Sequence, residues 1–303
     1  MATVLSRREL LAAAASLGAL RAVGSSMKLS ITVRIAEAPG SNQKTTMGFE
    51  EVVEVAKRTG FEALDMRASQ AGIQTPAERL LDMRKILDHH AIKVSCVTGD
   101  FDVPSNNDRA PDGLRKITPY LDVAEKLGTD LIRIGMKKED DIAAAQRACD
   151  EARERKIRLA HESHQGTLFE TVAGSLDVLK RVNRPNFGLI YEAGNWMVAG
   201  QDYGPATIRT FKPWIMNVFV QNYRITPNGK STVPTWTKGG VKVDLIGSWE
   251  RGGVDYQKVF RALHDIAYTG YVTAFAAFST FATPQEAAAK SYKHLKPLAT
   301  KSS

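Results

Sequence analysis

Carboxylate and amide side chains lie at the ends of three consecutive β-rich runs in the second half of the chain. Glu162 lies at the end of "IRLAHES", Glu192 at the end of "FGLIYEA", and Gln221 at the end of "IMNVFVQN". Oxygen ligands of this kind suit Mg²⁺ or Mn²⁺, and they can hold Zn²⁺ or Co²⁺ loosely. If the three runs end at one place in the fold, these residues predict a site for one divalent metal ion.

The run "LAHESHQG" adds two histidines to this pattern. Successive side chains of a strand point to opposite faces, so Ala160, Glu162 and, just beyond the strand, His164 share one face, whereas His161 belongs to the other. We expect Glu162 to point into the interior of a barrel, where a carboxylate needs a charge partner, a metal or a raised pKa. His161 is then a packing residue. His164 is either a substrate contact or an exposed loop histidine.

Further polar and aromatic residues follow the same strand ends. We predict that these residues, together with His164, bind the substrate: Asn195, Trp196, Tyr223 and Arg224. The alternative is structural, namely that the carboxylates are rim residues paired with Arg133, Lys137 or Arg224.

Eight β-rich runs alternate with amphipathic helical patterns from Lys28 onward, without a linker that would divide them. This alternation predicts a (β/α)8 TIM barrel, in which the ends of the strands carry the active site. A doubly wound open sheet is the alternative, but Glu37 to Gly40 after the first run is not a glycine-rich phosphate turn. The stretch from Thr226 to Gly253 is the longest irregular one, and we expect a binding loop or lid there.

Two helices are predicted to begin with the same device. Thr75 and Thr283 each precede a proline and stand three residues before a glutamate, as in a capping box. The two cysteines, Cys96 and Cys149, lack the spacing of a metal site or a disulfide framework, so we expect both to be small core residues.

The first 26 residues have the pattern of an export signal. Arg7 and Arg8 precede an apolar run that ends at Arg21, which is too short to span a membrane and resembles a twin-arginine signal. We therefore expect residues 1–26 to be a signal peptide, residues 27–303 to form one barrel domain, and the mature protein to be periplasmic. Its positive charge is not gathered in a stripe or an arm, so we expect no nucleic-acid partner; the oligomeric state stays open.

Four motifs, "AHESHQGT", "PNFGLIYEAGN", "GGVDYQKVFRAL" and "TGYVTA", resemble those of the xylose-isomerase-like group of sugar phosphate isomerases and epimerases. The resemblance extends from Lys28 to Leu298. It implies a barrel enzyme with one divalent metal, whose metal-bound carboxylates move protons on either face of a carbon next to a carbonyl.

The resemblance also implies a ligand set from the fifth to the eighth strand, typically Glu, Asp, His and Glu. The matching residues here are Glu162, Glu192 in place of Asp, and Gln221 in place of His. The fourth falls at Phe275 or Ala274, which can neither bind a metal nor accept a proton. We expect one ion of Mn, Mg, Co or Zn that is bound weakly or with help from the substrate, and a two-carboxylate mechanism that is not retained intact.

The combined prediction is a metal-assisted enzyme that removes a proton next to the carbonyl of a sugar or keto-sugar, with Glu162 as the base and Glu192 as a second catalytic carboxylate. The outcome would be epimerisation, isomerisation or, for an exported enzyme, elimination from a 3-keto-glycoside. Phosphorylated sugars are less expected, because they are largely cytoplasmic.

Two alternatives compete with this prediction. One is a non-catalytic sugar-binding protein on a degenerate barrel, favoured by Phe275, in which Trp196, Trp236 and Trp249 stack on sugar rings. The other is a DNA repair enzyme of the endonuclease four type, which shares the barrel but needs a histidine-rich, three-metal site and a basic face.

Overall fold

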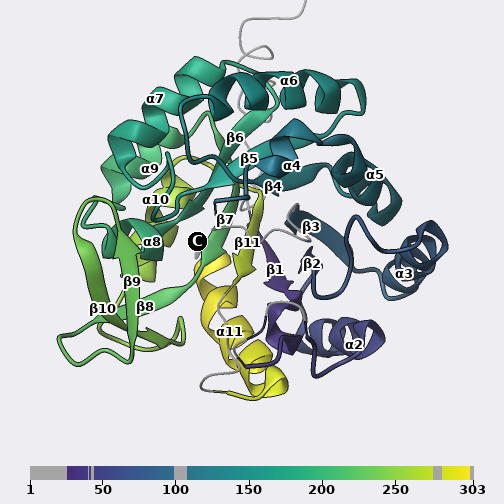
Figure 1. Cartoon of the computed structure of the whole chain (residues 1–303). Coiled ribbons are helices and arrows are strands. Elements are labelled where there is room, and N and C mark those ends of the chain that lie inside the picture. Colours follow the sequence, from purple (N-terminus) through teal and green to yellow (C-terminus); the bar gives the residue numbers. More distant parts are fainter. Residues whose placement is uncertain (1–25, 40, 42–43, 99–107, 276–281, 301–303) are drawn as a thin grey trace, which may run out of the picture.

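The computed structural model describes residues 26–39, 41, 44–98, 108–275 and 282–300, so the predicted signal peptide lies outside the described residues except for Ser26. Eight parallel strands close into a barrel in the order β1-β11-β7-β6-β5-β4-β3-β2 (Figure 1). This confirms the predicted (β/α)8 barrel. The barrel strands are β1 (Lys28–Thr32), β2 (Ala63–Met66), β3 (Lys93–Thr98), β4 (Leu131–Ile134), β5 (Arg158–Glu162), β6 (Phe187–Glu192), β7 (Ile215–Val220) and β11 (Tyr271–Ala274).

Helices surround the strands and cover the outer face of the barrel (Figure 1). Apolar residues at helical spacing bury one side of each longer helix; in α10, for example, Val259, Phe260 and Leu263 are buried. None of the described helices is long and apolar enough to cross a membrane. The helices are η1 (Val33–Ala36, a 3-10 helix), α2 (Phe49–Thr59), α3 (Ala77–His89), α4 (Asp112–Arg115), α5 (Thr118–Leu127), α6 (Asp141–Glu154), α7 (Val172–Val182), α8 (Ala193–Val198), α9 (Pro205–Phe211), α10 (Tyr256–Asp265) and α11 (Pro284–Ala299).

A small apolar layer fills the barrel interior. Its buried members are Cys96, Leu131, Ala160, Ile190, Phe219 and Phe275. The rings of Phe219 and Phe275 stack with their centroids 4.0 Å apart. Four polar residues stand two positions further along the same strands or their ends, and the two-residue repeat of a strand places them above this layer: Arg133, Glu162, Glu192 and Gln221. The apolar layer thus forms the floor of a polar mouth.

The segment from Thr226 to Gly253, predicted to be irregular, supplies two strands of a three-stranded antiparallel sheet in the order β8-β10-β9, and the third strand, β8, immediately precedes the segment. The sheet consists of β8 (Asn222–Ile225), β9 (Ser231–Thr235) and β10 (Gly239–Ile246), and it lies beside the barrel (Figure 1). The prediction of irregular structure was wrong because most of β9 and the first half of β10 are exposed or half-buried, so the apolar alternation that marks a strand is weak there.

Only one of the two predicted capping boxes forms. Thr283 caps α11 by accepting from the Glu286 backbone N–H, and Glu286 bonds back to Thr283. At α3 the N-cap is Pro76, and the Thr75 hydroxyl instead accepts from the Gly72 backbone N–H at 2.9 Å. The Thr75 hydroxyl therefore stabilises a local turn and does not cap the helix as the motif had predicted. Cys96 and Cys149 are both buried, as predicted.

Candidate active site

Glu162, Glu192 and Gln221 come together at the barrel mouth, because β5, β6 and β7 are consecutive neighbours in the closed sheet. All three side chains are buried. Gln221 Nε2 donates to Glu192 Oε1 at 3.4 Å, and the carboxyl groups of Glu162 and Glu192 share a hydrogen bond. The strand-end pattern thus identified residues that contact one another.

Glu162 is held as a carboxylate. It forms a buried ion pair with Arg133 and accepts a hydrogen bond from Asn195 Nδ2 at 3.2 Å. Burial alone would raise the pKa of Glu162, but the Arg133 charge and the hydrogen bond from Glu192 lower this pKa to about 2.

Glu192 is held as the neutral acid. Burial, the negative charge of Glu162 and the hydrogen bond between the two groups raise the pKa of Glu192 well above its ordinary value. Two carboxyl groups in contact cannot both ionise without a large electrostatic cost. The pair therefore carries one proton, and its two members differ in charge because only Glu162 has a guanidinium partner.

Gln221 is oriented by its neighbours. Its Oε1 accepts from Arg34 Nη1 at 3.2 Å, its Nε2 also donates to the Tyr223 hydroxyl, and its backbone carbonyl accepts from the Tyr256 hydroxyl at 2.7 Å. Gly194 lets α8 approach this backbone, since a Cβ there would clash with the Gln221 carbonyl oxygen. Burial raises the pKa of Tyr223, which therefore serves as a neutral hydroxyl beside the carboxyl pair.

The two histidines of "LAHESHQG" lie in different surroundings. The His161 ring stacks on Phe169 with the centroids 4.2 Å apart, and burial lowers the pKa of His161 to about 3, so it is a neutral packing residue. His164 is partly exposed, its Nδ1 bonds to the Gln165 carbonyl at 2.8 Å, and burial lowers its pKa. His164 thus offers a neutral imidazole close to Glu162.

Three residues predicted to contact the substrate have other partners. Asn195 is buried and donates to Glu162 and to the Ser163 carbonyl, so it positions the carboxylate. Trp196 is fully buried, and its indole N–H donates to the Phe169 carbonyl, so the prediction for Trp196 is corrected. The reason is that a helix starts immediately after Glu192, and each step of about 100° turns the next side chain away from the barrel. Arg224 bonds to the Arg251 carbonyl and pairs with Glu250, away from the carboxyl pair.

The other tryptophans also differ from the sugar-stacking role that the sequence left open. Trp236 is 60% exposed at the turn between β9 and β10, and Trp249 lies partly buried with the Lys290 ammonium 5.8 Å from its ring.

Sequence reasoning missed charged residues from the first two strands. Arg34 follows β1, and Arg67 follows β2; both pair with Glu37, at 3.6 Å and 2.8 Å respectively. Asp65 lies buried in β2 and accepts from the Thr32 hydroxyl at 2.9 Å, and burial raises the pKa of Asp65 to about 7. The available signal was a polar residue at every second position, as in "LDMR", which marks an interior face.

The described residues of the barrel mouth do not fit a divalent metal ion. Glu162 is already paired with Arg133, Glu192 holds a proton, and the only ligand oxygen of the Gln221 side chain accepts from Arg34. At the fourth position, which the resemblance placed at Phe275 or Ala274, Phe275 stacks on Phe219 and Ala274 is buried. Among the described residues, no group of three or more His, Cys, Asp and Glu side chains could hold a metal. Guanidinium groups already contact the side-chain oxygen atoms of Glu162 and Gln221.

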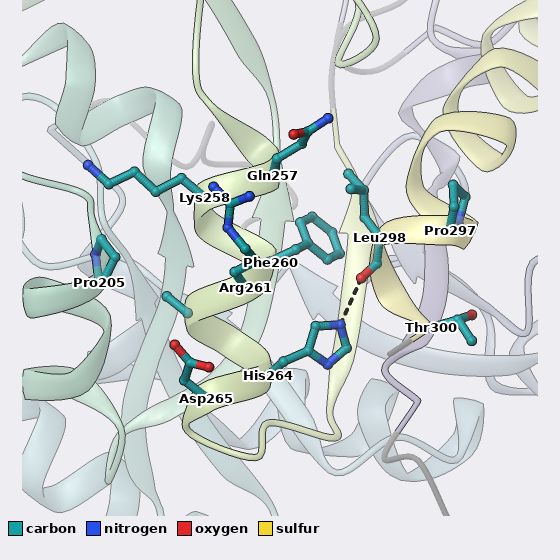
Figure 2. A pocket seen from close by; sticks show the side chains of 11 residues that line it. Pro205, Gln257, Lys258, Phe260, Arg261, His264, Asp265, Pro297, Leu298 and Thr300 are labelled. Carbon is teal, nitrogen blue, oxygen red and sulfur yellow. Dashed lines mark hydrogen bonds between the residues drawn. The ribbon is translucent and has the colours of Figure 1, made fainter. Parts of the chain in front are cut away.

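A prominent hollow lies elsewhere, on the outer helices. It is lined by α10, the C-terminal part of α11 and Pro205 of α9 (Figure 2). His264 Nε2 donates to the Leu298 carbonyl at 2.8 Å, which ties α10 to the end of α11. The hollow has no acid–base pair comparable to Glu162 and Glu192 among the residues that line it, and catalytic groups of such barrels stand at the strand ends.

Comparison with known proteins agrees with this architecture. A family model described as xylose isomerase-like TIM barrel matches residues 53–298. The probable 3-DHS dehydratase AsbF from Bacillus anthracis is 16% identical, with a TM-score of 0.68 over 89% of this chain and 98% of that one. The IolI protein with a bound zinc atom is 16% identical, with a TM-score of 0.67 over 90% and 98%.

A third structure is D-psicose 3-epimerase with D-tagatose from Clostridium cellulolyticum. It is 14% identical, with a TM-score of 0.66 over 91% of this chain and all of that one. No protein of curated function matches the sequence. At these identities the solved structures show that the fold is shared.

Proposed function

Because the chain belongs to the xylose isomerase-like TIM barrel family, we propose that it is an enzyme that moves a proton at the carbon next to the carbonyl of a sugar or keto-sugar. The observation that carries the proposal is the buried Glu162–Glu192 pair at the barrel mouth, in which Glu162 has a guanidinium partner and Glu192 an amide partner. This arrangement lowers the pKa of Glu162 and raises that of Glu192, so that one is a carboxylate and the other a carboxylic acid. Such a pair contains a base and an acid in contact, as in the aspartic proteases.

In the proposed reaction the C–H bond next to the carbonyl breaks, and its proton passes to the Glu162 carboxylate. The electron pair of that bond forms the C=C bond of an enediol, and the carbonyl oxygen takes the proton of Glu192. Glu162 is then neutral and Glu192 is ionised, so the charge of the pair is conserved. A low pKa alone would make Glu162 a weak base, and the simultaneous transfer from Glu192 offsets this weakness.

No step of this proposal passes through a metal ion. The predicted ion of Mn, Mg, Co or Zn would have to displace both Arg133 and the shared proton before Glu162 and Glu192 could bind it. Arg133 supplies the positive charge beside Glu162, and Asn195 fixes the orientation of the carboxylate.

Two outcomes of the enediol are compatible with the described side chains. Return of the proton to the same or the neighbouring carbon gives an epimer or an isomer, and loss of a β-substituent gives elimination. D-psicose 3-epimerase exemplifies the first outcome among structures of this fold, and the probable 3-DHS dehydratase the second. We favour elimination from a 3-keto-glycoside because the protein is predicted to be exported. Cell fractionation tests this export, with the Arg7→Lys/Arg8→Lys double variant as the control that should not be exported.

Exchange of substrate protons with solvent deuterium tests the proposal. The purified protein is incubated in D₂O with 3-keto-glucose, with a 3-keto-glucoside and with D-fructose, and deuterium uptake is followed by NMR with and without EDTA. The expected result is exchange by the wild type that EDTA does not remove and that is lost in Glu162→Gln. Glu286→Gln, an exposed Glu-to-Gln change in α11, is the matched control. If the wild type exchanges protons no faster than Glu162→Gln with any of the three carbonyl compounds, the result favours the non-catalytic sugar-binding alternative.

A further inference from the structure

Three arginine side chains converge on the Phe275 ring at the barrel mouth. The guanidinium carbons of Arg34, Arg67 and Arg133 lie 5.6, 5.7 and 6.0 Å from the centroid of this ring. The arginines come from the ends of β1, β2 and β4, whereas Phe275 follows β11. Segments far apart in the sequence therefore place their cations around one aromatic platform.

This cluster has more positive than negative charge. Glu37 pairs with Arg34 and Arg67, and Glu162 pairs with Arg133. Asp65 interacts electrostatically with Arg67 and Arg133, and since burial raises the pKa of Asp65 to about 7, this carboxyl is only partly ionised at neutral pH. Three guanidinium groups thus share two paired carboxylates and the partial charge of Asp65. Lys137, which follows β4, is itself paired with Asp108 at 3.5 Å.

Placing an excess cation in buried surroundings is unfavourable for folding. The side chains of Arg67 and Arg133 are only 11% and 5% exposed. Arg34 is more accessible, yet its Nε is buried and has no hydrogen-bond partner among the described residues. Burial and the repulsion from Arg67 lower the pKa of Arg34. An anion at the mouth would relieve this repulsion and accept from the guanidinium donors.

We propose that the cluster of Arg34, Arg67 and Arg133 binds a carboxylate group of the substrate, so that the enzyme acts on sugar acids. The inference rests on the proposed function, because the same mouth holds the Glu162–Glu192 pair, and it adds the substrate class. The excess of guanidinium groups over paired carboxylates favours an anion, and a planar carboxylate fits the planar fork of a guanidinium group. A phosphate ester is the other anion that arginines bind, and it carries nearly two charges at neutral pH.

Binding of matched sugar pairs tests the inference without requiring turnover. D-glucuronate and D-galacturonate differ from D-glucose and D-galactose only at C6, and the 6-phosphates of the same sugars form a third arm. Titration calorimetry on the wild type should show at least one uronate binding about ten- to hundred-fold more tightly than its neutral parent, as expected for charge-assisted hydrogen bonds. Binding of the uronate should also weaken as salt concentration increases.

Variants assign the effect to the cluster. Arg67→Gln removes one guanidinium, which pairs with Glu37, and it should weaken uronate binding at least tenfold more than it weakens binding of the neutral sugar. Arg158→Gln, at the start of β5 and paired with Asp130, removes an arginine at the opposite end of the barrel and should change neither. Far-UV circular dichroism checks that Arg67→Gln is folded, and the comparison of sugars in the wild type does not depend on any variant.

The outcomes separate this inference from the proposed function. If both uronates bind no more tightly than their neutral parents, or if only the 6-phosphates bind, the inference is wrong, whatever the exchange experiment shows. If a uronate binds through Arg67 but the protein exchanges no substrate proton, the carboxylate site is supported and the proposed chemistry fails.

Discussion

Replacement of Glu192 by Gln tests the shared proton on which the proposed chemistry depends. In the folded protein, burial and the neighbouring Glu162 raise the pKa of Glu192 well above the value of 4.5 for an unperturbed glutamate. Above about pH 4.5, folding therefore requires uptake of a proton that the unfolded chain has lost. The stability linked to Glu192 is complete below this pH and decreases as the pH rises toward the raised pKa.

The size of the effect follows from proton linkage. Uptake of one proton on folding lowers the free energy of unfolding by about 1.4 kcal/mol for each pH unit. Glutamine does not ionise, has nearly the same shape, and can donate its amide hydrogen to Glu162. The free energy of unfolding of Glu192→Gln, relative to wild type, should therefore rise by about 2 kcal/mol between about pH 5 and about pH 6.5. Asp65 titrates in both proteins and cancels in the difference.

Urea denaturation followed by tryptophan fluorescence, at several pH values and in the presence of EDTA, measures this difference. Glu286→Gln is the control, because hydrogen bonds from Thr283 lower the pKa of the Glu286 carboxyl, so that this group titrates below the tested range. Its difference from wild type should stay constant with pH. A constant difference for Glu192→Gln would show that both carboxyl groups are ionised in the folded protein and would refute the shared proton.

Three further predictions concern buried charges around the mouth and its adjoining loop. Arg133→Met leaves Glu162 without its charge partner and should lower the free energy of unfolding by about 3–5 kcal/mol. The double variant Arg133→Met/Glu162→Gln should recover much of this loss, and the absence of any recovery would contradict the ion pair. Asp65→Asn removes a carboxyl whose pKa burial raises to about 7, so its stability advantage should grow from about pH 4 to about pH 7 and then stay constant, unlike that of Glu192→Gln. Glu170→Gln weakens hydrogen bonds from the backbone N–H groups of Gly166, Trp236 and Thr237. It should lower the free energy of unfolding by about 2 kcal/mol and accelerate proteolysis at the β9–β10 turn. Unchanged cleavage at this turn would show that Glu170 does not hold it in place.

The barrel could be predicted from the sequence because its strands are buried on both sides. Such strands read as short apolar runs, and amphipathic helices between them complete the repeat. The sheet of β8, β9 and β10 could not be predicted in this way, because β9 is largely exposed and contains Pro234. A strand that buries few side chains shows no clear alternation of apolar and polar residues in its sequence.

The carboxyl pair could be predicted because side chains alternate between the two faces of a strand in "LAHES" and "LIYEA". This alternation continues to Glu162 and Glu192, the last residues of their strands. The role of Trp196 could not, since a helix replaces the strand at Ala193 and the two-residue repeat no longer applies. The arginine cluster was also missed. Arg34 and Arg67 stand just beyond short strands, and only the closed order of the barrel brings them to Phe275, more than 200 positions away in the sequence.

The two layers of the barrel explain how the fold and the chemistry can vary separately. Leu131, Ala160, Ile190 and Phe219 form part of the floor, and the residue two positions after each of them carries the charge or the hydrogen-bonding group of the mouth. A substitution in the upper layer changes charge and acid–base behaviour without changing the packing of the floor against its neighbours. Structures that share 14–16% of their residues with this chain nevertheless share its barrel. Here Phe275 belongs to the floor and stacks on Phe219, and the three arginines around its ring place positive charge beside the carboxyl groups of the mouth.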